Sequence, residues 1–137
     1  MLDLGAGEGA LTAHLTRAGA RVVAVELNPR RASVLRERFP GITVVQADAA
    51  SIPLPGRPFR VVANPPYGMS SGLLRTLLAP GSRLFAADLV LQRAVVRKYA
   101  SGAAAGFSLT SGILLPRRAF LPPPQVDSAV LVIRRRR

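Results

Sequence analysis

Short apolar runs alternate with amphipathic segments along the chain, and this alternation constrains the fold more than any other feature. The apolar runs lie close to glycine or proline, and the segments between them repeat their apolar residues at helical spacing. The pattern predicts strands at residues 1–5, 21–27, 42–46, 59–63, 82–91, 108–115 and 128–135, and helices at residues 10–18, 28–39, 70–79 and 92–100. Strands separated by helices require right-handed crossovers, so we expect a mainly parallel sheet with helices on both faces, the doubly wound α/β class.

No internal boundary divides the chain. Its 137 residues contain no repeat, no low-complexity segment and no linker, so we expect one domain over residues 1–137 with a sizeable core. Only residues 1–4 precede the first glycine turn, whereas strands typically contain ~5 or 6 residues. We therefore expect a sheet that is shortened at its N-terminal end.

Composition argues against several kinds of site. The chain has no cysteine, which argues against a disulfide scaffold, and its single histidine, His14, does not make a metal site. We therefore predict no metal. The most apolar stretch is interrupted by Asp88, so we expect no membrane partner, and we interpret the chain as a cytoplasmic monomer.

The charge balance points to a polyanionic partner. Nineteen basic residues stand against seven acidic ones, which gives a net charge of +12. A GC-rich genome would explain why all of these basic residues except Lys98 are arginine, but it does not explain the excess. A basic surface of this size is typical of nucleic-acid-binding proteins.

The first predicted turn has the pattern of a cofactor site. Gly5 and Gly7 follow the first strand, where missing side chains let backbone N–H groups approach a ligand. Three of the seven acidic residues, Asp3, Glu26 and Asp48, fall at the ends of consecutive predicted strands. Glu26 follows Gly5 by 21 residues, a position from which a carboxylate can accept both hydroxyls of a ribose. The turn alone also fits a dinucleotide fingerprint, so NAD stays possible at this point.

The stretch VVANPPYG, residues 61–68, indicates which kind of cofactor and substrate fits the site. Asn64 ends a predicted strand, and the proline after it holds its backbone extended. The Asn64 carboxamide oxygen and the Pro65 carbonyl form a rim of acceptors beside the flat ring of Tyr67. An exocyclic amino group has two hydrogens to donate to such a rim, so adenine N6 and a sulfonium methyl donor suit it, and positioning supplies much of the rate.

Five motifs together resemble those of the ribosomal RNA adenine-N6 methyltransferases. They are LDLGAGEGALT, VVAVELNP, VVQADA, VVANPPYG and FLPPPQVDSAVLVIRR, and they extend over nearly the whole chain. Within this family the chain is most similar to the short actinobacterial erythromycin-resistance enzymes that act on 23S rRNA. The resemblance implies a Rossmann-like class I fold, S-adenosylmethionine as cofactor, ribosomal RNA as partner and resistance to macrolide-type antibiotics.

The resemblance also implies roles for single residues. Glu26 would bind the cofactor ribose, Asp48 its adenine, and Asn64 both the cofactor and the target amino group. Tyr67 would stack on a flipped adenine, with Phe120 closing over the same base. The implied catalytic residues are Asn64, Pro65, Tyr67 and Phe120, and the implied cofactor residues are Asp3, Gly5, Ala6, Gly7, Glu26, Leu27, Asp48, Ala49 and Asn64.

Three departures from the family pattern leave alternatives open. We find neither the family's N-terminal cofactor-binding segment nor a C-terminal helical domain. Many ribosomal members have an aliphatic residue where Pro65 stands, and DNA adenine and protein glutamine methyltransferases also use an NPPY turn. The rival interpretations are therefore a DNA or protein methyltransferase, and an inactive basic RNA-binding remnant.

Overall fold

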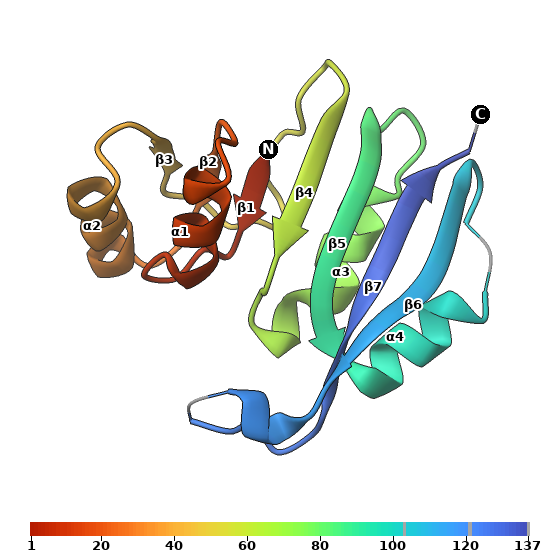
Figure 1. Ribbon diagram of the computed structural model, residues 1–137. Coiled ribbons are helices and arrows are strands. Elements are labelled where there is room, and N and C mark those ends of the chain that lie inside the picture. Colours follow the sequence, from red (N-terminus) through yellow and green to blue (C-terminus); the bar gives the residue numbers. More distant parts are fainter. Residues whose placement is uncertain (103, 121, 137) are drawn as a thin grey trace.

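The computed structural model describes residues 1–102, 104–120 and 122–136. These residues form a seven-stranded sheet with strand order β3-β2-β1-β4-β5-β7-β6 (Figure 1). The strands are β1 (Leu2–Leu4), β2 (Val23–Val25), β3 (Thr43–Val45), β4 (Phe59–Ala63), β5 (Leu84–Gln92), β6 (Phe107–Leu115) and β7 (Ser128–Arg135). The helices are α1 (Ala10–Arg17), α2 (Pro29–Arg38), α3 (Ser70–Leu77) and α4 (Arg93–Ala100), with two 3-10 turns, η1 (Tyr67–Met69) and η2 (Arg117–Ala119).

The order of the strands places the site. The strands from β3 to β5 are parallel, whereas β7 is antiparallel to both β5 and β6. From β1 the chain builds outward through β2 and β3, and it then returns to build the other half from β4. This reversal is the topological switch point, where open α/β sheets bind ligands beyond the carboxyl ends of the strands. Because Leu2 pairs with Val61, the segments that follow β1 and β4 leave the sheet side by side.

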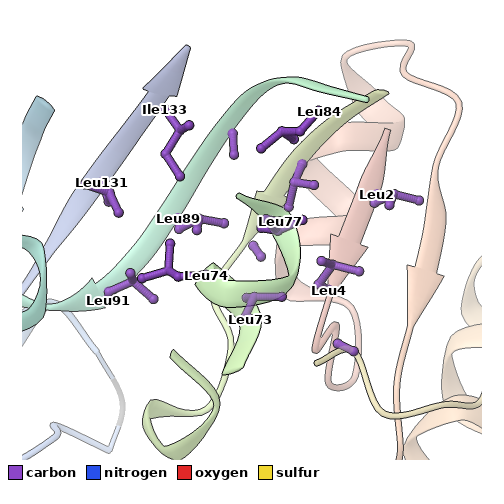
Figure 2. Close-up of a cluster of buried hydrophobic side chains, with 14 of the residues drawn as sticks. Leu2, Leu4, Leu73, Leu74, Leu77, Leu84, Leu89, Leu91, Leu131 and Ile133 are labelled. Carbon is purple, nitrogen blue, oxygen red and sulfur yellow. The ribbon is translucent and has the colours of Figure 1, made fainter. Parts of the chain in front are cut away.

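Most of the core lies between the sheet and α3 with α4. Leu73, Leu74 and Leu77 of α3 are fully buried against apolar side chains of β1, β4, β5 and β7 (Figure 2). A smaller cluster on the opposite face joins Leu35 of α2 to Ala24 of β2. Helices thus pack on both faces, as expected, but the α1 and α2 face is covered mainly over β1 to β3 (Figure 1). On the remaining part of that face Phe85 of β5 is 42% exposed.

Local sequence signals account for the helix boundaries. Asn28 caps α2 by accepting hydrogen bonds from the N–H groups of Arg30 and Arg31, and Pro29 occupies the first helical position. All of the predicted strands and helices are present, although β1, β2 and β3 have three residues each and are shorter than predicted. Within the described residues no helix combines the length and the apolar character needed to cross a membrane.

Candidate active site

One hollow of about 900 Å³ opens at the switch point. The turn after β1, the end of β2 and the turn after β4 form its walls. The segment that precedes β7 contributes Phe120 to the same hollow, although Phe120 lies more than fifty residues from Asn64 in the chain. The segment after β3 adds Ala47 and Ala49, so residues from five separate parts of the sequence face one space. Nine of the predicted site residues line it: Gly5, Gly7, Glu26, Leu27, Ala49, Asn64, Pro65, Tyr67 and Phe120.

The glycine turn after β1 is built from left-handed backbone. Gly5 and Gly7 have φ values of 70° and 61°, which side chains rarely tolerate. A Cβ on Gly5 would lie 3.2 Å from Pro66 Cδ and 3.3 Å from Pro65 Cα, so this glycine lets the two turns pack directly on each other. A Cβ on Gly7 would meet nothing within 4 Å, because Gly7 faces the open hollow.

The backbone N–H groups of this turn are already bonded within the protein. Those of Gly5 and Ala6 both donate to the Val25 carbonyl, at 2.9 and 3.0 Å, and that of Gly7 donates to Glu26. The expectation that they approach a ligand is therefore not met by these three residues. What the turn provides instead is bare backbone surface and a fixed position for Glu26.

Glu26 is held in one orientation by two backbone donors. Its Oε1 accepts from the Gly7 N–H at 2.7 Å and its Oε2 accepts from the Asn28 N–H at 2.8 Å. The side chain is buried yet lines the hollow. Each carboxylate oxygen keeps a further lone pair, so the group can accept hydrogen bonds from a ligand without rearranging.

The turn after β4 presents free acceptors. Asn64 is exposed, and no described residue donates a hydrogen bond to its carboxamide oxygen or to the Pro65 carbonyl. Pro65 itself is buried and Pro66 accepts from the Met69 N–H, which starts η1. The prolines thus fix the backbone while both acceptor oxygens stay available to a donor in the hollow.

Tyr67 is anchored by a residue that the sequence did not single out. Its hydroxyl lies 2.8 Å from the hydroxyl of Ser128, the first residue of β7, which is fully buried. This bond joins residues 61 positions apart in the chain. Tyr67 therefore has a fixed ring whose face lines the hollow together with Phe120.

Three predicted cofactor residues lie outside the lining of the hollow. Ala6 is buried against β2 and the helices on that face. Asp48 is exposed and accepts from the Ala50 N–H at 3.0 Å, while its neighbours Ala47 and Ala49 line the hollow. Asp3 is 1% exposed and accepts a hydrogen bond of 2.6 Å from the Thr12 hydroxyl, so it joins β1 to α1.

Burial changes the chemistry of Asp3. Removal from water raises the pKa of its carboxyl above the usual value, and the nearby Glu26 carboxylate adds to this effect. The hydrogen bond from Thr12 opposes the shift without cancelling it. Asp3 therefore has the environment of a structural carboxyl rather than of a ligand-facing one.

Several lining residues were missed in the sequence. They are Val25, Asn28, Pro29, Arg31, Ala47, Pro66, Met69, Pro122 and Pro124. Each lies within a few residues of a predicted one, so the motifs located the walls but not every side chain in them. Among the described residues no group of three or more histidine, aspartate or glutamate side chains could hold a metal ion.

Similar structures identify the fold. The chain is similar to the crystal structure of the 23S rRNA methyltransferase ErmE, with a TM-score of 0.87 and 34% identity, covering 98% of this chain and 60% of that one. It also superposes on magnesium protoporphyrin IX methyltransferase from Synechocystis PCC 6803, a structure with bound SAM, with a TM-score of 0.72. That protein is 19% identical over 98% of this chain and 69% of its own, a likeness of fold alone. The fold is thus the Rossmann-like fold of the class I S-adenosylmethionine-dependent methyltransferases.

Similar sequences lead to a family. The mycinamicin-resistance protein MyrB of Micromonospora griseorubida is 37% identical over 99% of this chain and 47% of its own length. Ribosomal RNA small subunit methyltransferase A of Geobacter sulfurreducens is 33% identical over 96% of this chain and 56% of its own length. The chain therefore spans about half the length of these relatives. The family model described as ribosomal RNA adenine dimethylase matches residues 1–137, and the chain belongs to this family.

Proposed function

We propose that the chain transfers a methyl group from S-adenosylmethionine to N6 of an adenine in ribosomal RNA. One observation carries this proposal. The free acceptors of Asn64 and Pro65 lie directly beside the glycine turn and Glu26, in one hollow that also contains Tyr67 and Phe120. A methyl donor and a flat base that receives the methyl group can therefore meet at the same hydrogen-bond acceptors.

The residues present fit the cofactor. The open backbone at Gly7 and the exposed Leu27 leave room for a nucleoside, and the two free lone pairs of Glu26 can accept from ribose hydroxyls. Asp48 follows β3 between the lining residues Ala47 and Ala49, and its carboxylate would accept from the amino group of the cofactor adenine. When bound, S-adenosylmethionine supplies a methyl group on a positively charged sulfur, which is a good leaving group.

The residues of this chain position and polarise the target amine. The Asn64 carboxamide oxygen and the Pro65 carbonyl each accept one N6–H bond, which favours a lone pair localised on N6 over one shared with the ring. Tyr67 and Phe120 hold the base by stacking, which fixes N6 against the acceptors. N6 would form the new bond to the methyl carbon through this lone pair as the bond from that carbon to the sulfonium sulfur breaks, which leaves a neutral thioether. N6 then releases one proton to water, so no separate strong base and no metal are required.

Relatives favour ribosomal RNA over DNA or protein as the substrate. The family description names ribosomal RNA, and the basic excess of the chain suits an RNA rather than a protein. MyrB is named for mycinamicin resistance and ErmE for 23S rRNA, which supports 23S rRNA as the target and macrolide resistance as the outcome. We also propose that the chain forms one catalytic domain and acts as a cytoplasmic monomer, since residues of one copy bring the acceptor rim, Glu26 and both aromatic side chains together.

Incubation with S-adenosylmethionine labelled on its methyl group tests the function. Separate samples of 23S rRNA, 16S rRNA, DNA and protein are expected to show label only in the RNA, on adenine N6, with 23S rRNA preferred. The variant Asn64→Ala is expected to lower transfer by about 100-fold or more, because one preorganised polar contact to the reacting group is lost. Gln46→Ala is the matched control, since Gln46 is an exposed carboxamide outside the hollow.

Each rival interpretation has its own outcome. Label in DNA or in protein glutamine would replace the RNA substrate with one of those classes. RNA binding without any binding of S-adenosylmethionine in isothermal titration would identify the chain as an inactive RNA-binding remnant. Equal transfer by Asn64→Ala and the Gln46→Ala control would remove Asn64 from the mechanism.

A further inference from the structure

A second hollow lies beside the active site, and its charge is positive. It has a volume of about 390 Å³ and is lined by Arg93 and Arg97 of α4 and by Arg117 of η2. Arg93 and Arg97 are four residues apart in one helix, so their side chains share one face. Asp127 is the one carboxylate in this lining.

The guanidinium groups of Arg93 and Arg97 have no hydrogen-bond partner among the described residues. Some other arginines of the chain already donate to acceptors within the protein. Arg134 pairs with Asp88 at 3.1 Å, and Arg135 donates to the Leu84 carbonyl at 2.7 Å. The two arginines of α4 therefore keep all of their donors for a ligand outside the protein.

Asp127 gives the hollow a fixed frame instead of neutralising it. Its carbonyl accepts from the Arg93 backbone N–H at 3.0 Å, and its Oδ1 accepts from the Arg117 backbone N–H at 2.7 Å. These bonds hold the start of α4 and the segment with η2 together. The carboxylate is directed to a backbone donor, and the Arg117 guanidinium donates to the Gln125 carbonyl at 3.4 Å. The guanidinium groups of Arg93 and Arg97 are thus the ones in this lining that have no partner among the described residues.

The frame connects this hollow to the base site. Ser128, which follows Asp127, holds the Tyr67 hydroxyl at 2.8 Å. Phe120 follows Arg117 by three residues, at the end of the same 3-10 turn. The arginine hollow and the two aromatic residues proposed to stack on the base are therefore joined through short stretches of backbone.

We propose that this hollow binds a backbone phosphate of the RNA next to the target adenine. The inference rests on the proposed function for the identity of the polymer. Arginine forks bind phosphate oxygens through paired, charge-assisted hydrogen bonds, and α4 supplies two such forks. Other exposed arginines do not contribute: Arg75 lies on α3 and Arg118 lies outside the lining of the hollow. The phosphate subsite thus sets where the strand enters, while Tyr67 and Phe120 take the base.

The test compares two double variants of equal charge. Arg93→Gln/Arg97→Gln removes both free forks, and Arg17→Gln/Arg36→Gln removes two exposed arginines from α1 and α2. The probe is a stem-loop RNA with one unpaired adenine, titrated over a range of KCl concentrations. We expect the first variant to bind about tenfold more weakly, with a salt slope shallower by about 0.7 for each lost phosphate contact, and the second to match the wild type.

A modified RNA tests whether the arginines contact the phosphate next to the target adenine. A neutral methylphosphonate replaces a phosphate flanking the unpaired adenine. The wild type is expected to lose affinity for this RNA, whereas Arg93→Gln/Arg97→Gln is expected to lose no more than it has already lost. S-adenosylmethionine affinity and melting temperature are expected to be the same in both double variants, because neither arginine of α4 lines the larger hollow.

Two results would overturn the phosphate subsite. One is equal RNA binding by the two double variants, and the other is a methylphosphonate effect that adds fully to that of the arginine substitutions. The proposed function fails separately, if the wild type transfers no methyl group to RNA while the arginine variants still weaken RNA binding as expected.

Discussion

The bond between Tyr67 and Ser128 shows how single residues prepare the site. The two hydroxyl groups lie 2.8 Å apart, and Ser128 is fully buried. A buried hydroxyl that loses its partner keeps the full cost of its removal from water. Under the proposed function, Tyr67 therefore contributes in two ways, through its ring to the base and through its hydroxyl to the fold.

Substitutions at Tyr67 separate these contributions. We expect Tyr67→Ala to weaken binding of an RNA with an unpaired adenine by about 1–3 kcal/mol, the value of one base–aromatic stack. Tyr67→Phe keeps the ring, so it should bind RNA nearly as tightly. It should, however, unfold about 1–3 kcal/mol more easily in urea, because the Ser128 hydroxyl is left unpaired.

A second substitution is the control for this argument. Tyr67→Phe/Ser128→Ala removes both hydroxyl groups, so most of the lost stability should return. If the double variant is less stable than Tyr67→Phe alone, Ser128 has another role and the pair is not the reason for the loss.

Asp3 makes a prediction about pH. Because burial raises its pKa, the native state keeps a proton that the unfolded state releases above about pH 4. The contribution of the protonated Asp3 carboxyl to the free energy of unfolding is thus present in full at low pH, and it is lost as pH rises through the native pKa. In Asp3→Asn no charge forms, and the amide oxygen still accepts from Thr12. We expect the unfolding free energy of this variant, relative to the wild type, to increase from pH 4 to pH 7.

An exposed carboxylate provides the comparison for Asp3. Glu8→Gln changes a side chain in open solvent near the same turn. Asp3→Asn is expected to gain stability relative to the wild type over this pH range by more than Glu8→Gln does. An equal gain in the two variants would show that burial does not control the Asp3 carboxyl.

The positions of site residues were most directly predictable where a motif lies in one segment. Asn64 and Pro65 are adjacent, so the backbone restriction of proline was enough to place their acceptors. Ser128 gave no signal, since its partner is 61 residues away and hydroxyl pairs of that separation depend on the finished sheet. Assignment of Glu26 and Asp48 to the cofactor stays a prediction.

At the scale of elements, the packing of α1 against α2 depends on one glycine. Gly9 has φ of 100°, and a Cβ there would overlap the Phe39 ring and lie 3.0 Å from Leu35 Cδ2. Gly19 has a similar φ of 87°, but a Cβ there would meet nothing within 4 Å. The pair therefore separates backbone strain from packing.

We expect Gly19→Ala to lower the free energy of unfolding by about 1–2 kcal/mol through left-handed strain alone. Gly9→Ala should lower the free energy of unfolding by about 1–3 kcal/mol more than Gly19→Ala does, because Phe39 and α2 must shift. Urea denaturation of both variants measures the difference. Equal losses would mean that the Phe39 ring moves aside freely.

The types of the elements were predictable, but their pairing was only partly so. Apolar runs between helical segments were enough to give the parallel half of the sheet, because crossovers have one hand. Nothing local predicts that β7 inserts between β5 and β6, since that order depends on pairing across long connections. The 3-10 turns η1 and η2 were also missed, because three residues carry too little periodicity.

At the scale of the whole molecule, the net charge of +12 should act on the two ligands differently. RNA affinity is expected to fall steeply with KCl, because phosphate contacts release counterions. Affinity for S-adenosylmethionine should change little, since its site depends on Glu26 and bare backbone. Titrations of both ligands at several salt concentrations measure this contrast. If the affinity for S-adenosylmethionine falls as steeply as the affinity for RNA, charged side chains contribute to cofactor binding as well.

The contact between Gly5 and the two prolines has a thermodynamic consequence. Since the turn after β1 touches Pro65 and Pro66, neither turn can adjust without the other. Ligands on the two turns are then linked, and linkage is reciprocal: whatever factor the cofactor adds to base affinity, the base adds to cofactor affinity. Under the proposed function, transfer of the methyl group changes both ligands at once, so the strength of this linkage should differ between the complex before transfer and the complex after it.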